Sequence, residues 1–112
     1  MSDAVNKVVL AELKELLEDG FPLLVERFVD DGEARIAKMD NAIASNDAQT
    51  LYGEAHGLKG SSRNVGAAEL AEQCAMLENM GHQENLTDAA ETFASVKAEF
   101  DRACDELKSF SC

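Results

Sequence analysis

Apolar side chains recur every three or four residues along nearly the whole chain, and no stretch alternates between apolar and polar residues with a period of two. The first spacing is typical of amphipathic α-helices, whereas alternation is typical of half-buried strands. We therefore predict an all-helical fold. The pattern divides into five helices, which cover about residues 4–19, 22–45, 48–63, 67–80 and 88–110.

Each predicted helix carries one apolar stripe that we expect to face the core. In chain order the stripes are Val5, Val9, Leu13 and Leu16; Val25, Val29, Gly32, Ile36, Met39 and Ile43; Leu51, Ala55, Leu58 and Ser62; Leu70, Cys74 and Leu77; and Ala89, Phe93, Val96, Phe100, Ala103, Leu107 and Phe110. At the helix ends, Gly20 is expected to cap the first helix, Pro22 to start the second, and Gly81 to stop the fourth. Thr87 or Asp88 would cap the fifth.

Four amphipathic helices joined by short connections favour an antiparallel up-and-down four-helix bundle. The first, shorter helix is left to cover one end of that bundle. We expect residues 1–112 to form a single domain, because a chain of this length has room for one hydrophobic core. A bundle is a scaffold, however, and its periodicity does not say what it does.

The charge balance narrows the class of partner. The chain has 22 acidic and 10 basic residues, a formal net charge of −12 and a pI near 4.4. Such a surface repels nucleic acid and anionic lipid, so we expect neither as a partner. The absence of a long apolar run and of a secretory signal at the N-terminus predicts a cytoplasmic protein.

The three cysteines are too few and too scattered for a disulfide framework. Cys74 and Cys104 lie on predicted apolar faces, and we expect them to be buried packing residues. Cys112 is the last residue and has no expected role.

One segment breaks the pattern of the other helices. Gly53, Gly57 and Gly60 lie within eight residues of the helix predicted over 48–63. Each glycine inside a helix costs about 1 kcal/mol relative to alanine, so the three cost about 3 kcal/mol of a total stability of roughly 5–15 kcal/mol. A cost of that size indicates that the segment serves a function.

A histidine lies among these glycines. On a helical wheel, His56 is about 140° from the apolar stripe and points to solvent. Gly60 and Gly53 fall about 40° and 60° to one side of it, and the other side holds Arg63, Tyr52 and Lys59. We expect the glycines to let the bulky face of another protein approach the ring.

Charge singles out the same segment, because residues 55–68 contain no Asp or Glu. An exposed imidazole is largely neutral at cytoplasmic pH and is a competent nucleophile through its unprotonated nitrogen. Lys59, one turn further on, can reach back to an anionic group attached to His56, and Arg63 can supplement it.

Other chemistries fit less well. Neither His56 nor His82 has a His or Cys three or four residues away, so no metal site is expected. Residues 57–62 carry Lys before Gly inside a helix, unlike a nucleotide-binding loop, which has the reverse order after a strand. His82 is predicted to be a loop residue without a role.

The run His56-Gly57-Leu58-Lys59-Gly60-Ser61-Ser62, followed by Gly66, resembles the signature of histidine-containing phosphotransfer (HPt) domains. Leu70-Ala71-Glu72 and Leu77-Glu78 resemble the following helix of that family. The resemblance implies that His56 is the phosphoacceptor, that Lys59 stabilises the phosphoryl oxygens and that Gly60 keeps the approach open. Some members hold the imidazole with a Gln on the next helix; here that position is Glu78, and Gln73 is a possible substitute.

The resemblance also implies a function. It indicates a free-standing, monomeric phosphorelay intermediate that exchanges a phosphoryl group with receiver domains of hybrid sensor kinases and response regulators. No cofactor would be needed, because the Mg²⁺ and most of the catalytic machinery would belong to the receiver. The protein would be a carrier and not an enzyme in its own right. The alternative is a helical adaptor that binds a receiver or kinase without carrying phosphate. A purely structural acidic bundle would leave the glycines unexplained.

Overall fold

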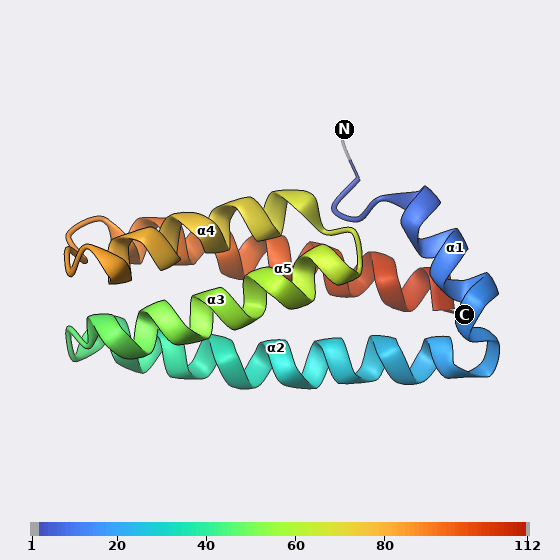
Figure 1. Cartoon of the computed structure of the whole chain (residues 1–112), viewed down its shortest axis with the longest axis horizontal. Coiled ribbons are helices and arrows are strands. Elements are labelled where there is room, and N and C mark those ends of the chain that lie inside the picture. Colours follow the sequence, from blue (N-terminus) through green and yellow to red (C-terminus); the bar gives the residue numbers. More distant parts are fainter. Residues whose placement is uncertain (1–2, 112) are drawn as a thin grey trace.

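The computed structural model describes residues 3–111, and every regular element in that range is helical. The elements are α1 (Lys7–Leu17), a 3₁₀ helix (Glu18–Gly20), α2 (Phe21–Ala44), α3 (Ala48–Asn64), α4 (Ala68–His82) and α5 (Ala89–Ser111). Helices α2 to α5 run up and down beside one another, and α1 crosses one end of this bundle (Figure 1). The predicted fold class and the end-covering first helix are therefore confirmed.

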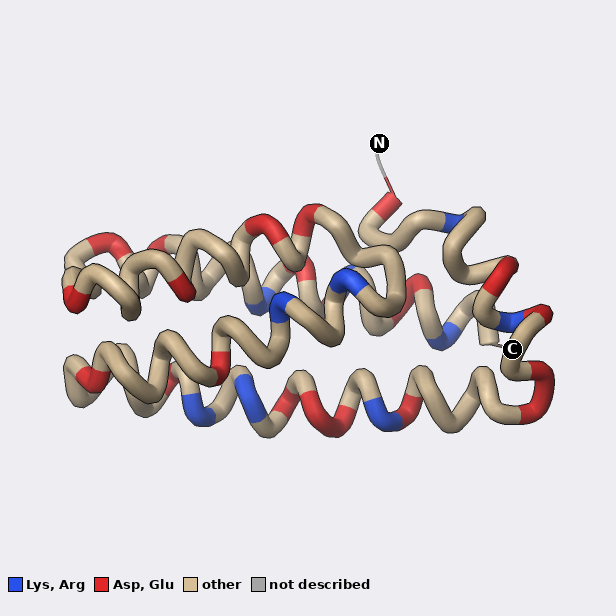
Figure 2. Tube along the Cα trace, viewed as in Figure 1, with Lys and Arg blue, Asp and Glu red and all other residues tan. Residues whose placement is uncertain are grey.

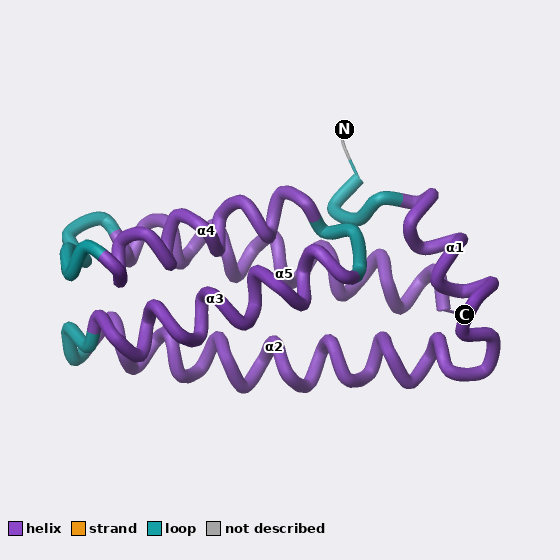
Figure 3. Tube along the Cα trace, viewed as in Figure 1, coloured by secondary structure: helices purple, strands orange, loops and turns teal. Residues whose placement is uncertain are grey.

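The four bundle helices meet on the apolar stripes predicted for them. In α3, Leu51, Ala55, Leu58 and Ser62 are all 0% exposed. The buried Ser62 hydroxyl donates a 2.7 Å hydrogen bond to the carbonyl of Leu58, which satisfies its polar atom within the helix. Helix α3 is continuous between the loops at its two ends (Figure 3), so the middle of α3 lies on a fully helical segment.

The first helix is shorter than predicted, and one residue of its predicted stripe is exposed. It begins at Lys7, because the side chain of Asn6 accepts hydrogen bonds from the amides of Val8 and Val9 and caps it. Leu16, predicted to face the core, is 78% exposed, whereas Leu10 is fully buried. Val5 is buried although it precedes the helix, and Leu13 packs against the core, so Leu16 is the one exposed residue of the predicted stripe.

The N-terminal segment is anchored by hydrogen bonds to residues far along the sequence. Glu106 of α5 accepts hydrogen bonds from the backbone amides of Ala4 (2.8 Å) and Val5 (3.1 Å). The amide of Asn6 donates to the carbonyl of Gly66 in the turn between α3 and α4. These contacts tie the end-covering helix to both sides of the bundle.

Two glycines that were predicted to end helices, Gly20 and Gly81, have other positions in the structure. Gly20 has a φ of −78° and does not cap α1; the residue with positive φ there is Glu18, at 50°. The chain continues through the 3₁₀ helix directly into α2, where Pro22 lies in the first turn as predicted.

Gly81 lies inside α4 and not at its end, because α4 continues to His82. A Cβ atom on Gly81 would stand 2.8 Å from the carbonyl oxygen of Ala48 and 2.8 Å from the amide nitrogen of Tyr52. Glycine is needed here for the close approach of two helix backbones. His82 is therefore a helical residue, and its prediction as a loop residue was wrong.

Candidate functional site

His56 lies in the middle of α3 on the side opposite its buried stripe. Its side chain is 62% exposed. The helix is fixed on the core by Leu51, Ala55 and Leu58, and its N-terminus is capped by Asp47, whose carboxylate accepts from the amide and hydroxyl of Thr50. An accessible imidazole is thus presented by a segment that is itself rigidly packed.

One carboxylate of the neighbouring helix joins His56 to Lys59. Oε2 of Glu78 on α4 lies 2.9 Å from Nδ1 of His56, and Oε1 lies 2.5 Å from Nζ of Lys59. The side chains of Glu78 and Lys59 are only 15% and 18% exposed. The three residues therefore form one connected cluster, of which the imidazole is the exposed member.

The protonation of this cluster follows from the pKa of Glu78. Burial raises that pKa, but the hydrogen bonds from Lys59 and His56 outweigh the burial and hold it below the usual value of 4.5. The carboxylate is therefore ionised at neutral pH and acts only as an acceptor. In the neutral tautomer that suits this contact, Nδ1 of His56 carries the proton and Nε2 carries the lone pair.

The three glycines of the motif do not share one role. A Cβ atom on Gly53 or Gly60 would meet nothing within 4 Å, so these two leave an open strip beside the imidazole, as predicted. Gly57 differs, because a Cβ atom there would lie 2.2 Å from a guanidinium nitrogen of Arg35 on α2. Because Gly57 has no side chain, the guanidinium of Arg35 can pass close to the backbone of α3.

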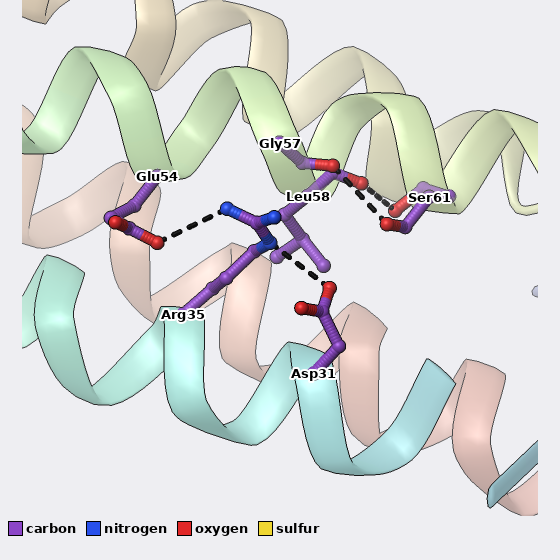
Figure 4. Close-up of polar contacts among 7 residues, drawn as sticks. Asp31, Arg35, Glu54, Gly57, Leu58 and Ser61 are labelled. Carbon is purple, nitrogen blue, oxygen red and sulfur yellow. Dashed lines mark hydrogen bonds and ion pairs between the residues drawn. The ribbon is translucent and has the colours of Figure 1, made fainter. Parts of the chain in front are cut away.

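Figure 4 shows that contact. The guanidinium of Arg35 lies between Asp31, at 2.9 Å, and Glu54, at 3.2 Å, and passes beside Gly57. The group links α2 to α3 beside Gly57. Sequence reasoning missed Arg35, since nothing in the spacing of residues on two separate helices singled it out.

The other predicted site residues lie further from the cluster. The side chain of Gln73 donates to Glu69 at 3.3 Å and takes no part in the contact with His56, so of the two alternatives Glu78 is the residue that reaches the ring. Arg63 is exposed near the end of α3, and no ion pair joins it to another of the residues 3–111.

The C-terminal half of α3 carries basic residues and no acidic ones. Figure 2 shows Lys and Arg, and no Asp or Glu, over the C-terminal half of this helix, whereas acidic positions occur on every other long helix of the bundle. This matches the acid-free run of residues 55–68. An anionic group would therefore meet less repulsion here than elsewhere on the surface.

Two rings at the site were not predicted to belong to it. The ring of Tyr52 stacks on that of His56, with 6.2 Å between centroids and 12° between planes. His82 on α4 also contacts Tyr52, at 5.9 Å between centroids. A shallow depression of about 330 Å³ beside them is lined by Tyr52, Lys59, Ala75, Glu78, Asn79 and His82. On the wheel Tyr52 already lay near His56; the contribution of His82 was not visible from the sequence.

The cysteines take no part in the exposed site. Cys74 and Cys104 are free and buried, and burial raises the pKa of each thiol to about 12. Cys112 lies outside the described residues. Within the described range, no three His, Cys, Asp or Glu side chains are grouped so as to hold a metal ion. Likewise, none of the helices in that range is long and apolar enough to cross a membrane.

Comparison with known proteins agrees with this geometry. Over residues 23–109 the chain matches the family model described as the Hpt domain. It is 32% identical over 88 residues to the phosphorelay intermediate protein YPD1 of Candida albicans, a match that covers 76% of this chain. The chain spans about half the length of that curated relative, 48%.

A solved structure is similar along nearly the whole chain. The crystal structure of histidine-containing phosphotransfer protein B (HptB) from Pseudomonas aeruginosa matches with a TM-score of 0.92 and 34% identity, covering 97% of this chain and 95% of that one. With the family model, the curated relative and the shared fold in agreement, the chain belongs to the Hpt domain family.

Proposed function

We propose that this protein is a phosphorelay intermediate that carries a phosphoryl group on Nε2 of His56. The main support is the contact between Glu78 and the imidazole. Oε2 of Glu78 lies 2.9 Å from Nδ1, which leaves Nε2 as the nitrogen available for reaction on a side chain that is 62% exposed. The open strip at Gly53 and Gly60 gives a partner access to that nitrogen.

The chemistry is a transfer between two carriers. The lone pair of Nε2 attacks the phosphorus of an aspartyl phosphate, an N–P bond forms, and the acyl O–P bond breaks to release the donor carboxylate. The Nδ1 proton stays on the hydrogen bond to Glu78, whose negative charge stabilises the positive charge that the ring acquires. In the reverse sense, a receiver carboxylate attacks phosphorus and the ring leaves as neutral imidazole.

Lys59 shares the carboxylate of Glu78 with His56 and so lies beside this exchange. In the unphosphorylated protein its ammonium is paired with Glu78. A phosphoryl group adds roughly −1.5 to −2 charge near neutral pH, and the flexible lysine can then share its donors between the carboxylate and the phosphoryl oxygens. The acid-free surface of residues 55–68 adds no opposing charge.

The proposed partners are receiver domains of hybrid sensor kinases and of response regulators, which would supply the Mg²⁺ and most of the catalysis. On this account the protein is a carrier and not an independent enzyme. The near-complete mutual coverage with HptB supports a single domain over residues 1–112, which we propose to act as a monomer. The free thiols of Cys74 and Cys104 support a cytoplasmic location, where thiols remain reduced.

The test is transfer from a receiver domain labelled with radioactive phosphate. Wild-type protein should acquire label that is stable in alkali and lost in acid, and His56→Gln should acquire none. Absence of label on the wild type, or equal label on His56→Gln, would contradict the proposal. Receiver binding without any transfer would instead favour an adaptor that carries no phosphate.

A further inference from the structure

The hydrogen bond to Glu78 restrains the His56 ring in one direction only. It holds Nδ1 near Oε2 of Glu78, but the ring can still rock about the axis that joins these two atoms. Because the side chain is 62% exposed, no tight packing prevents that motion. A second contact is needed to fix the plane of the ring and with it the direction of Nε2.

Tyr52 supplies a contact of that kind. Its ring lies nearly parallel to the imidazole, with 12° between the planes and 6.2 Å between the centroids. Offset-stacked rings resist rocking because a change in tilt either separates the two faces or brings their atoms into collision. The tyrosine ring therefore opposes the motion that Glu78 permits.

Tyr52 is itself held in place by α4. Its backbone nitrogen and Cα would lie 2.8 Å and 3.0 Å from a Cβ atom on Gly81, so the two helix backbones are in close contact at this point. Its ring also contacts His82, the residue that follows Gly81. The same helix thus fixes Tyr52 through Gly81 and His82, and fixes His56 through Glu78.

We propose that Tyr52 is a positioning residue for His56, which holds the imidazole plane so that Nε2 points into the open strip beside Gly53 and Gly60. The proposal rests on the proposed role of His56 in phosphoryl transfer. The stacked ring, and not the hydroxyl, is the active part, since no hydrogen bond from the Tyr52 hydroxyl is found within residues 3–111. A phenylalanine at this position should therefore work almost as well.

The first test measures the free protein, so that no effect of partner docking enters. Carbon-13 relaxation of the Cδ2 and Cε1 groups of His56 should show a restrained ring in the wild type and in Tyr52→Phe, and a more mobile ring in Tyr52→Ala. Met76→Ala is the matched control, because Met76 is another exposed large apolar residue, 50% exposed and on α4. Equal ring mobility in Tyr52→Ala and the wild type would overturn the proposal, as would a Tyr52→Phe variant that behaves like Tyr52→Ala.

The second test measures reactivity without a protein partner. Phosphoramidate donates its phosphoryl group directly to histidine: the N–P bond to Nε2 forms while the P–N bond to the departing ammonia breaks. Tyr52→Ala should react about tenfold more slowly than the wild type, as expected when a nucleophile loses its orientation. Tyr52→Phe and Met76→Ala should react within about twofold of it. A wild-type rate in Tyr52→Ala would overturn the positioning role.

The two tests separate this proposal from the proposed function. If the wild type takes no phosphoryl group from either phosphoramidate or a phosphorylated receiver, the function of His56 is contradicted. The ring-mobility comparison still decides whether Tyr52 holds the imidazole.

Discussion

Nδ1 of His56 and Oε2 of Glu78 lie 2.9 Å apart. The two residues are 22 positions apart in the sequence and belong to the adjacent helices α3 and α4. Some members of the family hold the imidazole with a glutamine, and the resemblance left Glu78 and Gln73 as the alternatives here; in this chain the carboxylate of Glu78 makes the contact. An amide can only hold the ring, whereas a carboxylate also neutralises charge that the ring gains on phosphorylation.

Glu78→Ala should therefore slow phosphoryl transfer to His56. A hydrogen bond between charged groups contributes about 1.5–3 kcal/mol, which corresponds to a rate loss of about 10- to 100-fold if the bond acts fully in the transition state. Glu78→Gln keeps the acceptor and should lose less. Single-turnover transfer from a phosphorylated receiver measures the effect. The control is Glu72→Ala, an exposed acid of α4, and a Glu78→Ala rate equal to that control would show that the contact has no role in transfer.

Lys59→Ala should also slow transfer while the helical circular dichroism signal stays unchanged. The substitution removes the cation available to the phosphoryl oxygens, and we expect a loss of about tenfold or more. Lys59→Arg should recover part of the rate. Lys97→Ala, which removes an exposed cation of α5, is the matched control. Unchanged transfer in Lys59→Ala would mean that the ammonium serves only to pair with Glu78.

Gly60→Ala should stabilise the fold and slow the reaction with a protein partner. A Cβ atom there meets nothing, so the helix gains about 1 kcal/mol, equivalent to about 4 °C in melting temperature. The same methyl group obstructs the strip beside His56, and transfer from a receiver should fall about tenfold. Gly53→Ala should behave alike. If both variants transferred at the wild-type rate, the strip would not be the approach used by the partner.

Gly81→Ala should destabilise the protein, because its Cβ atom would collide with backbone atoms of Ala48 and Tyr52 that have no freedom to move. Overpacking of this kind costs about 1–3 kcal/mol, against about 1 kcal/mol of helix propensity gained. In Gly57→Ala the collision is with the end of the Arg35 side chain, which can swing away, so its stability should change by less than about 0.5 kcal/mol. Urea unfolding of the two variants compares them, and a Gly81→Ala protein as stable as Gly57→Ala would refute the close contact.

Stability should fall in acid through the anchor of the N-terminal segment. Burial raises the pKa of Glu106, but hydrogen bonds from Ala4, Val5 and Lys7 outweigh it and leave the pKa below the usual 4.5. Stabilisation by Glu106 is thus complete above about pH 4.5 and lost as the pH falls through its folded-state pKa.

Glu106→Gln should therefore cost about 1 kcal/mol at pH 7, and the cost should shrink as the pH falls below 4.5 and the wild-type carboxyl takes up its proton. Urea unfolding at a series of pH values measures the difference. A cost that stays the same across the series would contradict this account of the anchor.

The inward-facing residues were predictable for helices that pack between two neighbours, because such helices bury one continuous stripe. All four inward residues predicted for α3 are fully buried, because that helix lies against α2 and α4 along its whole length. Helix α1 was predicted less well: it covers an end of the bundle, so its exposed Leu16 gives no reliable signal of a buried face.

The position of the candidate site was predictable, whereas of its inter-helix contacts only the one to Glu78 was named, as one of two alternatives given by the family resemblance. His56, Lys59 and the open glycines lie on one helix, where wheel geometry relates them directly. The contributions of Glu78, His82 and Arg35 depend on how α2 and α4 register against α3. That register is set by contacts such as Gly81 against Tyr52, which the sequence showed only as a glycine suited to ending a helix.

The most direct test of the central claim is to locate the phosphoryl group by nuclear magnetic resonance of the phosphorylated, nitrogen-15-labelled protein. Our account predicts a single phosphohistidine at residue 56, with phosphorus coupled to Nε2 and the proton retained on Nδ1 beside Glu78. Phosphorus bonded to Nδ1, or found on any residue other than His56, would contradict it.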